Sequence, residues 1–86
     1  MPYIEQQQRE KLDLPLRLLI RVLRDAPDGA VNYVITRLVD AHYKGKGYVG
    51  YNAALGVLEA VKQEYYRRII APYENVKRNE NGEVYC

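Results

Sequence analysis

The chain has 86 residues, of which 48% are hydrophobic, and a formal net charge of +2 at pH 7. This length favours one domain with a thin core, and the apolar fraction argues against a disordered chain. The small net charge argues against wholesale nucleic-acid binding, which needs a strongly basic surface. All of the aromatic residues are tyrosines. Because each buried hydroxyl needs a partner, we expect these rings in a shallow core or at interfaces.

Signatures of catalysis, metal binding and membrane insertion are missing from the sequence. The chain has no serine, His42 is its only histidine and Cys86 is its only cysteine. A serine triad, an intramolecular disulfide and a thiolate metal site are therefore excluded. No stretch approaches the roughly 20 apolar residues of a membrane span, and the N-terminus lacks the apolar segment of a signal peptide. We expect a non-catalytic, cytoplasmic protein without cofactor, metal or membrane partner.

In chain order, the first expected element is a helix from about Leu14 to Arg24. Residues 1–11 are polar and rich in glutamine, and we expect them to form an N-terminal arm. Asp13 stands where an N-cap would, and Pro15 lies in the first turn, where proline is common. Four apolar residues at helical spacing form the stripe of this helix: Leu16, Leu19, Ile20 and Leu23.

The second expected helix covers about Val31 to His42. Its apolar residues recur at steps of three and four, which indicates a helix. A strand remains an alternative, because Val, Ile, Thr and Tyr all favour sheets. The preceding segment, 26–29, contains proline and glycine and predicts a turn. Two glycines in the segment 44–47 are expected to end the helix.

The longest expected helix covers Tyr51 to Val76. Gly56 lies inside it at a cost of about 1 kcal/mol relative to alanine, which suggests close packing there. Pro72 lacks a backbone N–H and is expected to kink the helix or end it near Ile70. Residues 79–86 are expected to form a turn and an extended tail. The apolar stripe of this helix comprises Ala54, Leu58, Val61, Tyr65, Ile69, Pro72 and Val76.

These elements predict an all-α fold for residues 1–86. The expected architecture is a single domain, either a small helical hairpin or a three-helix domain, with one long C-terminal helix that is kinked at Pro72. A thin core and a long tyrosine-rich helix also predict a homo-oligomer, because one short partner helix would leave apolar surface exposed. The long helix is expected to supply the interface.

Two clusters combine arginine with tyrosine. Tyr33 and Arg37 are four residues apart, and Arg67 and Arg68 follow Tyr66 directly. Guanidinium groups bind phosphate oxygens and aromatic rings stack on bases, so both clusters are candidate sites for an anionic ligand. The alternative is an internal salt bridge or an oligomer interface, since Glu64 lies within one turn of the second cluster.

A series of motifs runs through nearly the whole chain: Pro2–Ile4, Arg9, Asn32–Leu38, Gly56–Glu59, Lys62, Glu64, Tyr66–Arg68, Pro72–Glu74 and Asn81–Tyr85. In these motifs the chain resembles a family of small uncharacterised proteins of tailed phages and bacteria. The resemblance implies a setting and no catalytic residues. It adds Tyr73 to the candidate ligand-binding residues, through the motif Pro72–Glu74.

That setting implies an accessory protein, with counter-defence as the expected role, in the cytoplasm of the host cell. In the favoured hypothesis, a homo-oligomer binds or sequesters a phosphate-bearing nucleotide signal between its subunits. The alternative is a protein-interaction or structural module that docks on a protein partner through its helical face. A nucleotide binder should gain thermal stability when the ligand is added, and an interaction module should not.

Overall fold

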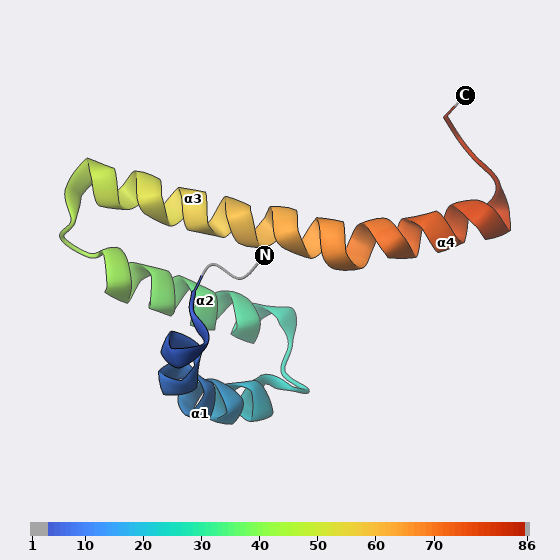
Figure 1. Cartoon of the computed structure of the whole chain (residues 1–86). Coiled ribbons are helices and arrows are strands. Elements are labelled where there is room, and N and C mark those ends of the chain that lie inside the picture. The colour runs from blue at the N-terminus through green and yellow to red at the C-terminus, as the bar shows by residue number, and fades with distance from the viewer. Residues whose placement is uncertain (1–3, 86) are drawn as a thin grey trace. The chain divides into compact units, whose positions relative to one another are not determined.

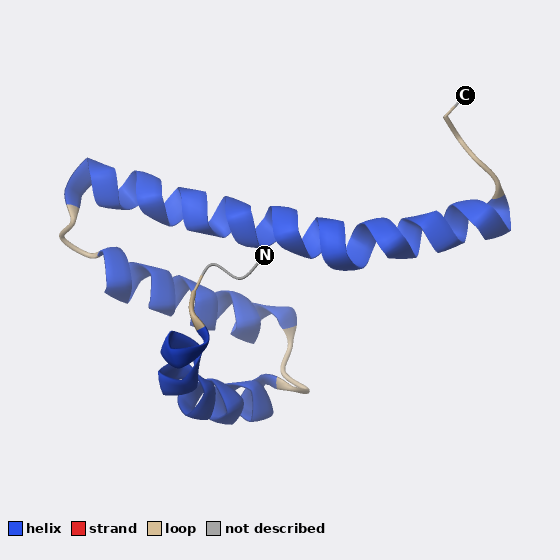
Figure 2. Ribbon diagram, viewed as in Figure 1, coloured by secondary structure: helices blue, strands red, loops and turns tan. Residues whose placement is uncertain are grey.

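The computed structural model describes residues 4–85, which form helices joined by short loops (Figures 1 and 2). There is no strand in this range, so the all-α prediction is confirmed and the strand alternative for the second helix is wrong. Three segments join into one C-terminal helix of 35 residues. The elements are α1 (Gln6–Leu23), α2 (Asp28–Tyr43), α3 (Gly47–Tyr65), the π-helical turn η1 (Tyr66–Ile70) and α4 (Ala71–Asn81).

The helices fall into two compact units, Met1–Ala41 and His42–Cys86. The first unit contains α1 and most of α2, and the second contains the end of α2 and the whole long helix. The prediction that residues 1–86 form a single domain remains a prediction.

Helix α1 begins at Gln6, and the expected start near Leu14 is wrong. Glu5 is the N-cap residue, and its backbone N–H donates to Oε1 of Gln8 at 3.0 Å, as in a capping box. This reciprocal arrangement satisfies donors that a helix start leaves unpaired. Part of the expected N-terminal arm is therefore helical. Pro15, which was expected in the first turn, lies well inside the helix.

Glycines follow the ends of α2 and of the long helix, as expected. The long helix, however, ends later than predicted. Gly45 and Gly47 have φ angles of 76° and 70°, in the left-handed region that only glycine enters without strain. Gly82 has a φ of 94°, and its N–H donates to the carbonyl oxygen of Arg78 at 2.8 Å. Helix α4 continues to Asn81, so the turn expected from residue 79 is wrong.

The long helix passes Pro72 through a wider turn. An α-helical path would bring the proline ring against the carbonyl of Arg68 and leave that carbonyl without its usual donor. The structure instead has the π turn η1, in which the N–H of Ala71 donates to the oxygen of Tyr66, five residues earlier. A π turn inserts one extra residue and relieves the crowding. The irregularity expected at Pro72 is therefore this turn, and the helix does not end there.

Very little of the chain is buried. Within residues 4–85, Gly50 and Ala54 are the buried residues, and Leu19 and Leu23 of α1 are half-buried. A Cβ atom added at Gly56 would have no neighbour within 4 Å, so the close packing expected there is wrong. Most of the apolar stripes remain accessible.

Candidate functional site

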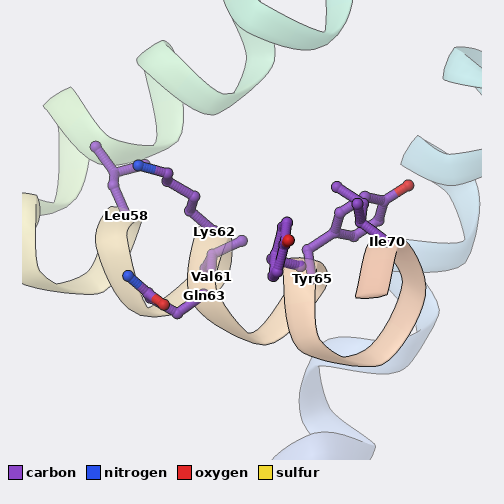
Figure 3. A pocket seen from close by; sticks show the side chains of 7 residues that line it. Leu58, Val61, Lys62, Gln63, Tyr65 and Ile70 are labelled. Atoms are coloured by element: carbon purple, nitrogen blue, oxygen red, sulfur yellow. The ribbon is translucent and has the colours of Figure 1, made fainter. Parts of the chain in front are cut away.

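An apolar hollow lies along one side of the long helix (Figure 3). Its volume of about 580 Å³ is within the range of ligand pockets. Ligand pockets, however, enclose most of their ligand, and this hollow is lined by α3 and η1 alone. A single helix covers only one side of any occupant, so the hollow needs a second surface to complete it. Its lining comprises Leu58, Val61, Lys62, Gln63, Tyr65, Tyr66 and Ile70.

The π turn decides which residues line the hollow. The extra residue rotates the following segment by roughly 100° relative to an unbroken α-helix. Ile70 consequently lies in line with Leu58 and is half-buried, whereas Ile69, which the helical spacing placed on the stripe, is 54% exposed. Of the predicted stripe, Leu58, Val61 and Tyr65 line the hollow, and Ile70 takes the place expected for Ile69.

A hydrogen bond spans the π turn. The hydroxyl of Tyr66 donates to Oε2 of Glu74 at 3.1 Å, across a separation of eight residues. In a regular α-helix residues eight apart point about 80° away from each other. The rotation introduced by η1 reduces that angle and makes the contact possible. The hydrogen bond to Glu74 and the negative charge of this carboxylate raise the pKa of Tyr66.

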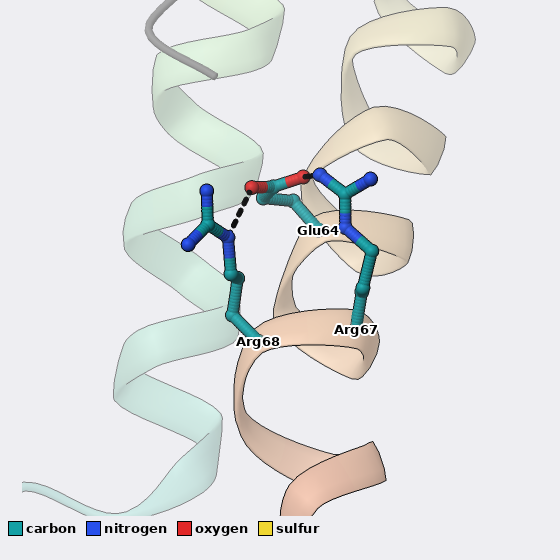
Figure 4. A network of polar contacts seen from close by, with 3 residues as sticks. All are labelled: Glu64, Arg67 and Arg68. Atoms are coloured by element: carbon teal, nitrogen blue, oxygen red, sulfur yellow. Dashed lines mark hydrogen bonds and ion pairs between the residues drawn. The ribbon is translucent and has the colours of Figure 1, made fainter.

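The two adjacent arginines of the predicted site share one carboxylate (Figure 4). Nε of Arg68 donates to Oε1 of Glu64 at 3.1 Å, and Nη2 of Arg67 donates to Oε2 of the same residue. The hydrogen bond from Arg68 and the charge of Arg67 lower the pKa of Glu64. We call these three residues the Glu64 network. Because Glu64 partly neutralises both guanidinium groups, less positive charge is available to a ligand.

The other predicted cluster is also an internal contact. Nη1 of Arg37 donates to the hydroxyl of Tyr33 at 2.9 Å, and the guanidinium carbon lies 5.8 Å from the centre of the ring. This confirms the pairing expected from the spacing of four residues. Tyr33 also borders a second, more open hollow at the start of α2, which includes Asp28. A carboxylate at that position disfavours a phosphate ligand.

The predicted site residues lie in different units of the chain. Tyr33 and Arg37 belong to the unit Met1–Ala41, and the other four belong to the unit His42–Cys86. Of these four, Tyr73 contacts a cation, since Nζ of Lys77 lies 5.7 Å from its ring centre. The sequence reasoning missed the contact between Glu74 and Tyr66, because this contact depends on the π turn. The pairing of Glu64 with the two arginines, by contrast, can be predicted from their spacing in the sequence.

The described part of the chain offers no candidate metal centre, because no three His, Asp, Glu or Cys residues gather closely enough within it. No helix within residues 4–85 combines the length and the apolar character needed to cross a membrane.

Comparison with known proteins places the chain in a family. The sequence profile of the domain of unknown function DUF6899 matches residues 1–84, so the chain belongs to that family. A search of curated proteins finds no significant match. A search of solved structures finds none either.

Proposed function

We propose that this member of the family is a helical interaction module that works as a homo-oligomer through its long helix. The supporting observation is the apolar hollow along the long helix, which α3 and η1 alone line and which therefore needs a second surface to complete it.

The chemistry of the exposed surface supports association. The first third of the long helix, residues 47–58, contains no charged side chain. Tyr48, Val49 and Leu55 within it are 78%, 80% and 66% exposed. Soluble monomers rarely expose continuous apolar surface of this kind, and where they do it marks an interaction site. Association removes this surface from water and stabilises the helix.

The nucleotide-binding hypothesis remains a prediction, together with the phage setting, the counter-defence role and the cytoplasmic location. The contacts of its candidate residues favour the interaction module. Arg67 and Arg68 are engaged by Glu64, and Arg37 is engaged by Tyr33. A phosphate ligand would have to compete with these internal partners. The proposed module is non-catalytic, in keeping with a sequence that has no serine and a single histidine.

Measuring the molecular mass in solution tests the proposal. Light scattering and sedimentation equilibrium at tens of micromolar should give an integer multiple of 10.0 kDa. On dilution the average molecular mass should fall toward that of the monomer, and the protein concentration at which it falls gives the dissociation constant. A chain that stays monomeric throughout this range would contradict the proposal.

Calorimetry with a panel of cyclic and linear nucleotides separates the two functions. The interaction module should bind none of them below about 100 μM. Binding that is tight in the parent and lost in the variants Arg68→Ala and Tyr66→Ala would instead support the nucleotide hypothesis.

A further inference from the structure

The apolar hollow coincides with the middle of the long helix. The helix covers Gly47–Asn81 and the hollow covers residues 58–70, so both are centred on Glu64. We propose that two copies of the chain pair antiparallel through this hollow, with a two-fold axis near Glu64. This proposal rests on the proposed function and specifies its partner, orientation and contact residues.

Two-fold symmetry about Glu64 pairs residues that lie at equal distances on either side of it. Leu58 of one copy then meets Ile70 of the other, and the same contact forms again at the opposite end of the hollow. Both residues line the hollow in the single chain. Each copy thus supplies the second surface that the other lacks, and both apolar ends of the hollow are covered by apolar side chains.

Charge complementarity supports the same pairing. Lys62 is the cation that lines the hollow; its side chain is 75% exposed, and Oε1 of Glu59 lies 3.7 Å from its Nζ. The symmetry brings Lys62 beside Tyr66 of the second copy, whose hydroxyl is bound to Glu74. An ammonium group is attracted both to an aromatic ring and to a nearby carboxylate.

A parallel pairing in register would have the opposite electrostatic effect. It would place Lys62 of one copy beside Lys62 of the other. Like charges placed opposite one another weaken an interface. The antiparallel arrangement instead brings each Lys62 beside Tyr66, so the cation that lines the hollow favours it.

The length of the helix is also adequate for a stable dimer. At 1.5 Å per residue, 35 helical residues extend about 52 Å. Centring the axis on Glu64 allows the two helices to overlap over this whole length. The overlap also places residues 70–81 of the second copy beside the charge-free segment 47–58, which would otherwise remain exposed.

Disulfide trapping tests the orientation. In a Cys86→Ser background, Leu58→Cys and Ile70→Cys chains are prepared separately, mixed and oxidised. Facing Cα atoms of two packed helices lie about 4–6 Å apart, within the reach of a disulfide. We expect the mixed 58–70 disulfide to exceed the 58–58 and 70–70 products at least fivefold. Predominance of the 58–58 product would establish a parallel pairing and overturn the proposal.

This experiment distinguishes failure of the orientation from failure of the proposed function. Each cysteine variant is first analysed by sedimentation under reducing conditions. A monomeric parent chain contradicts the proposed function itself. An oligomeric chain that forms no 58–70 disulfide leaves the proposed function intact and overturns only the antiparallel pairing.

A charge exchange provides a second test. Lys62→Glu should weaken the dimer roughly tenfold, because the new carboxylate would face Tyr66 of the second copy, whose hydroxyl is bound to the carboxylate of Glu74. Glu74→Lys should weaken it similarly, and the double variant should recover to within threefold of the parent. Arg78→Glu is the matched control, since Arg78 pairs with Glu83 outside the hollow and should leave the dissociation constant unchanged. A double variant as weak as the single ones would contradict the proposed contact.

Discussion

The two parts of the long helix are stabilised in different ways. Residues 47–58 carry no charge and expose large apolar side chains. Residues 59–81 form several ion pairs and hydrogen bonds within the same helix, including the Glu64 network and the pair Lys77–Glu80. Exposed pairs of this kind each contribute about 0–1 kcal/mol. The second part therefore has local support, whereas the first depends on burial against another surface.

This difference fits a continuous helix that also supplies the proposed interface. An isolated helix is marginal in water unless side-chain contacts or packing stabilise it. Local pairs hold the C-terminal part together in the single chain. In the proposed oligomer the charge-free part gains its stability through association, so substitutions there should affect oligomer formation most.

Leu55→Glu should have the largest effect. Leu55 is 66% exposed in the charge-free segment, and association would bury the new carboxylate in an apolar interface. We expect the dissociation constant to rise roughly 100-fold, which sedimentation equilibrium would measure. Val22→Glu on α1 is the control, because Val22 is 76% exposed and lies in the other unit. Equal effects of both substitutions would show that the long helix is not the interface.

Pro72→Ala should have the next largest effect, on the path of the helix. Alanine restores the backbone N–H, so the segment can return to a regular α-helix, with a gain in the free energy of unfolding of about 1–3 kcal/mol. The contact between Tyr66 and Glu74 should then be lost. Urea unfolding measures the gain, and Pro15→Ala provides a control in a helix without a π turn. A raised pKa of Tyr66 that persists in Pro72→Ala would contradict this explanation.

Two glycines of α3 should respond in opposite directions to substitution by alanine. Gly56 has open space around it, so Gly56→Ala should raise the free energy of unfolding by about 1 kcal/mol. A Cβ at Gly50 would overlap the Cβ of Lys46, so Gly50→Ala should lower it by about 1–3 kcal/mol. Thermal unfolding of the two variants makes a matched comparison. A gain in both would show that the loop before α3 adapts without strain.

The titration of Tyr66 should show the smallest effect. Its pKa is raised by Glu74 in the folded chain, so this contact contributes stability below pH 10 that is lost as the pH rises through the folded pKa. Glu74→Gln should bring the pKa of Tyr66 back toward 10. NMR of ring-labelled tyrosine resolves this residue from the other tyrosines, and Glu80→Gln serves as the control. An unchanged pKa in Glu74→Gln would show that the hydrogen bond is absent in solution.

The helical character of the chain and several of its contacts are predictable from sequence. The spacing of apolar residues predicts α2 and the long helix, and glycines mark the ends at Gly45 and Gly82. Residue spacing also predicts the pairing of Tyr33 with Arg37. These predictions succeed because they depend on interactions within about one turn of helix. The spacing of apolar residues places the start of α1 too late, because the capping residues Glu5 and Gln8 lie in a polar segment before the apolar stripe.

The sequence by itself determines that this chain is helical and that its apolar residues form stripes, because both properties follow from local spacing. Only the three-dimensional structure decides where the stripe of the long helix runs after Tyr65. The clash of Pro72 with the preceding turn produces η1, which aligns Ile70 with Leu58 and brings Glu74 to Tyr66. Spacing rules assume a constant 3.6 residues per turn, and one inserted residue changes the register of every position after it.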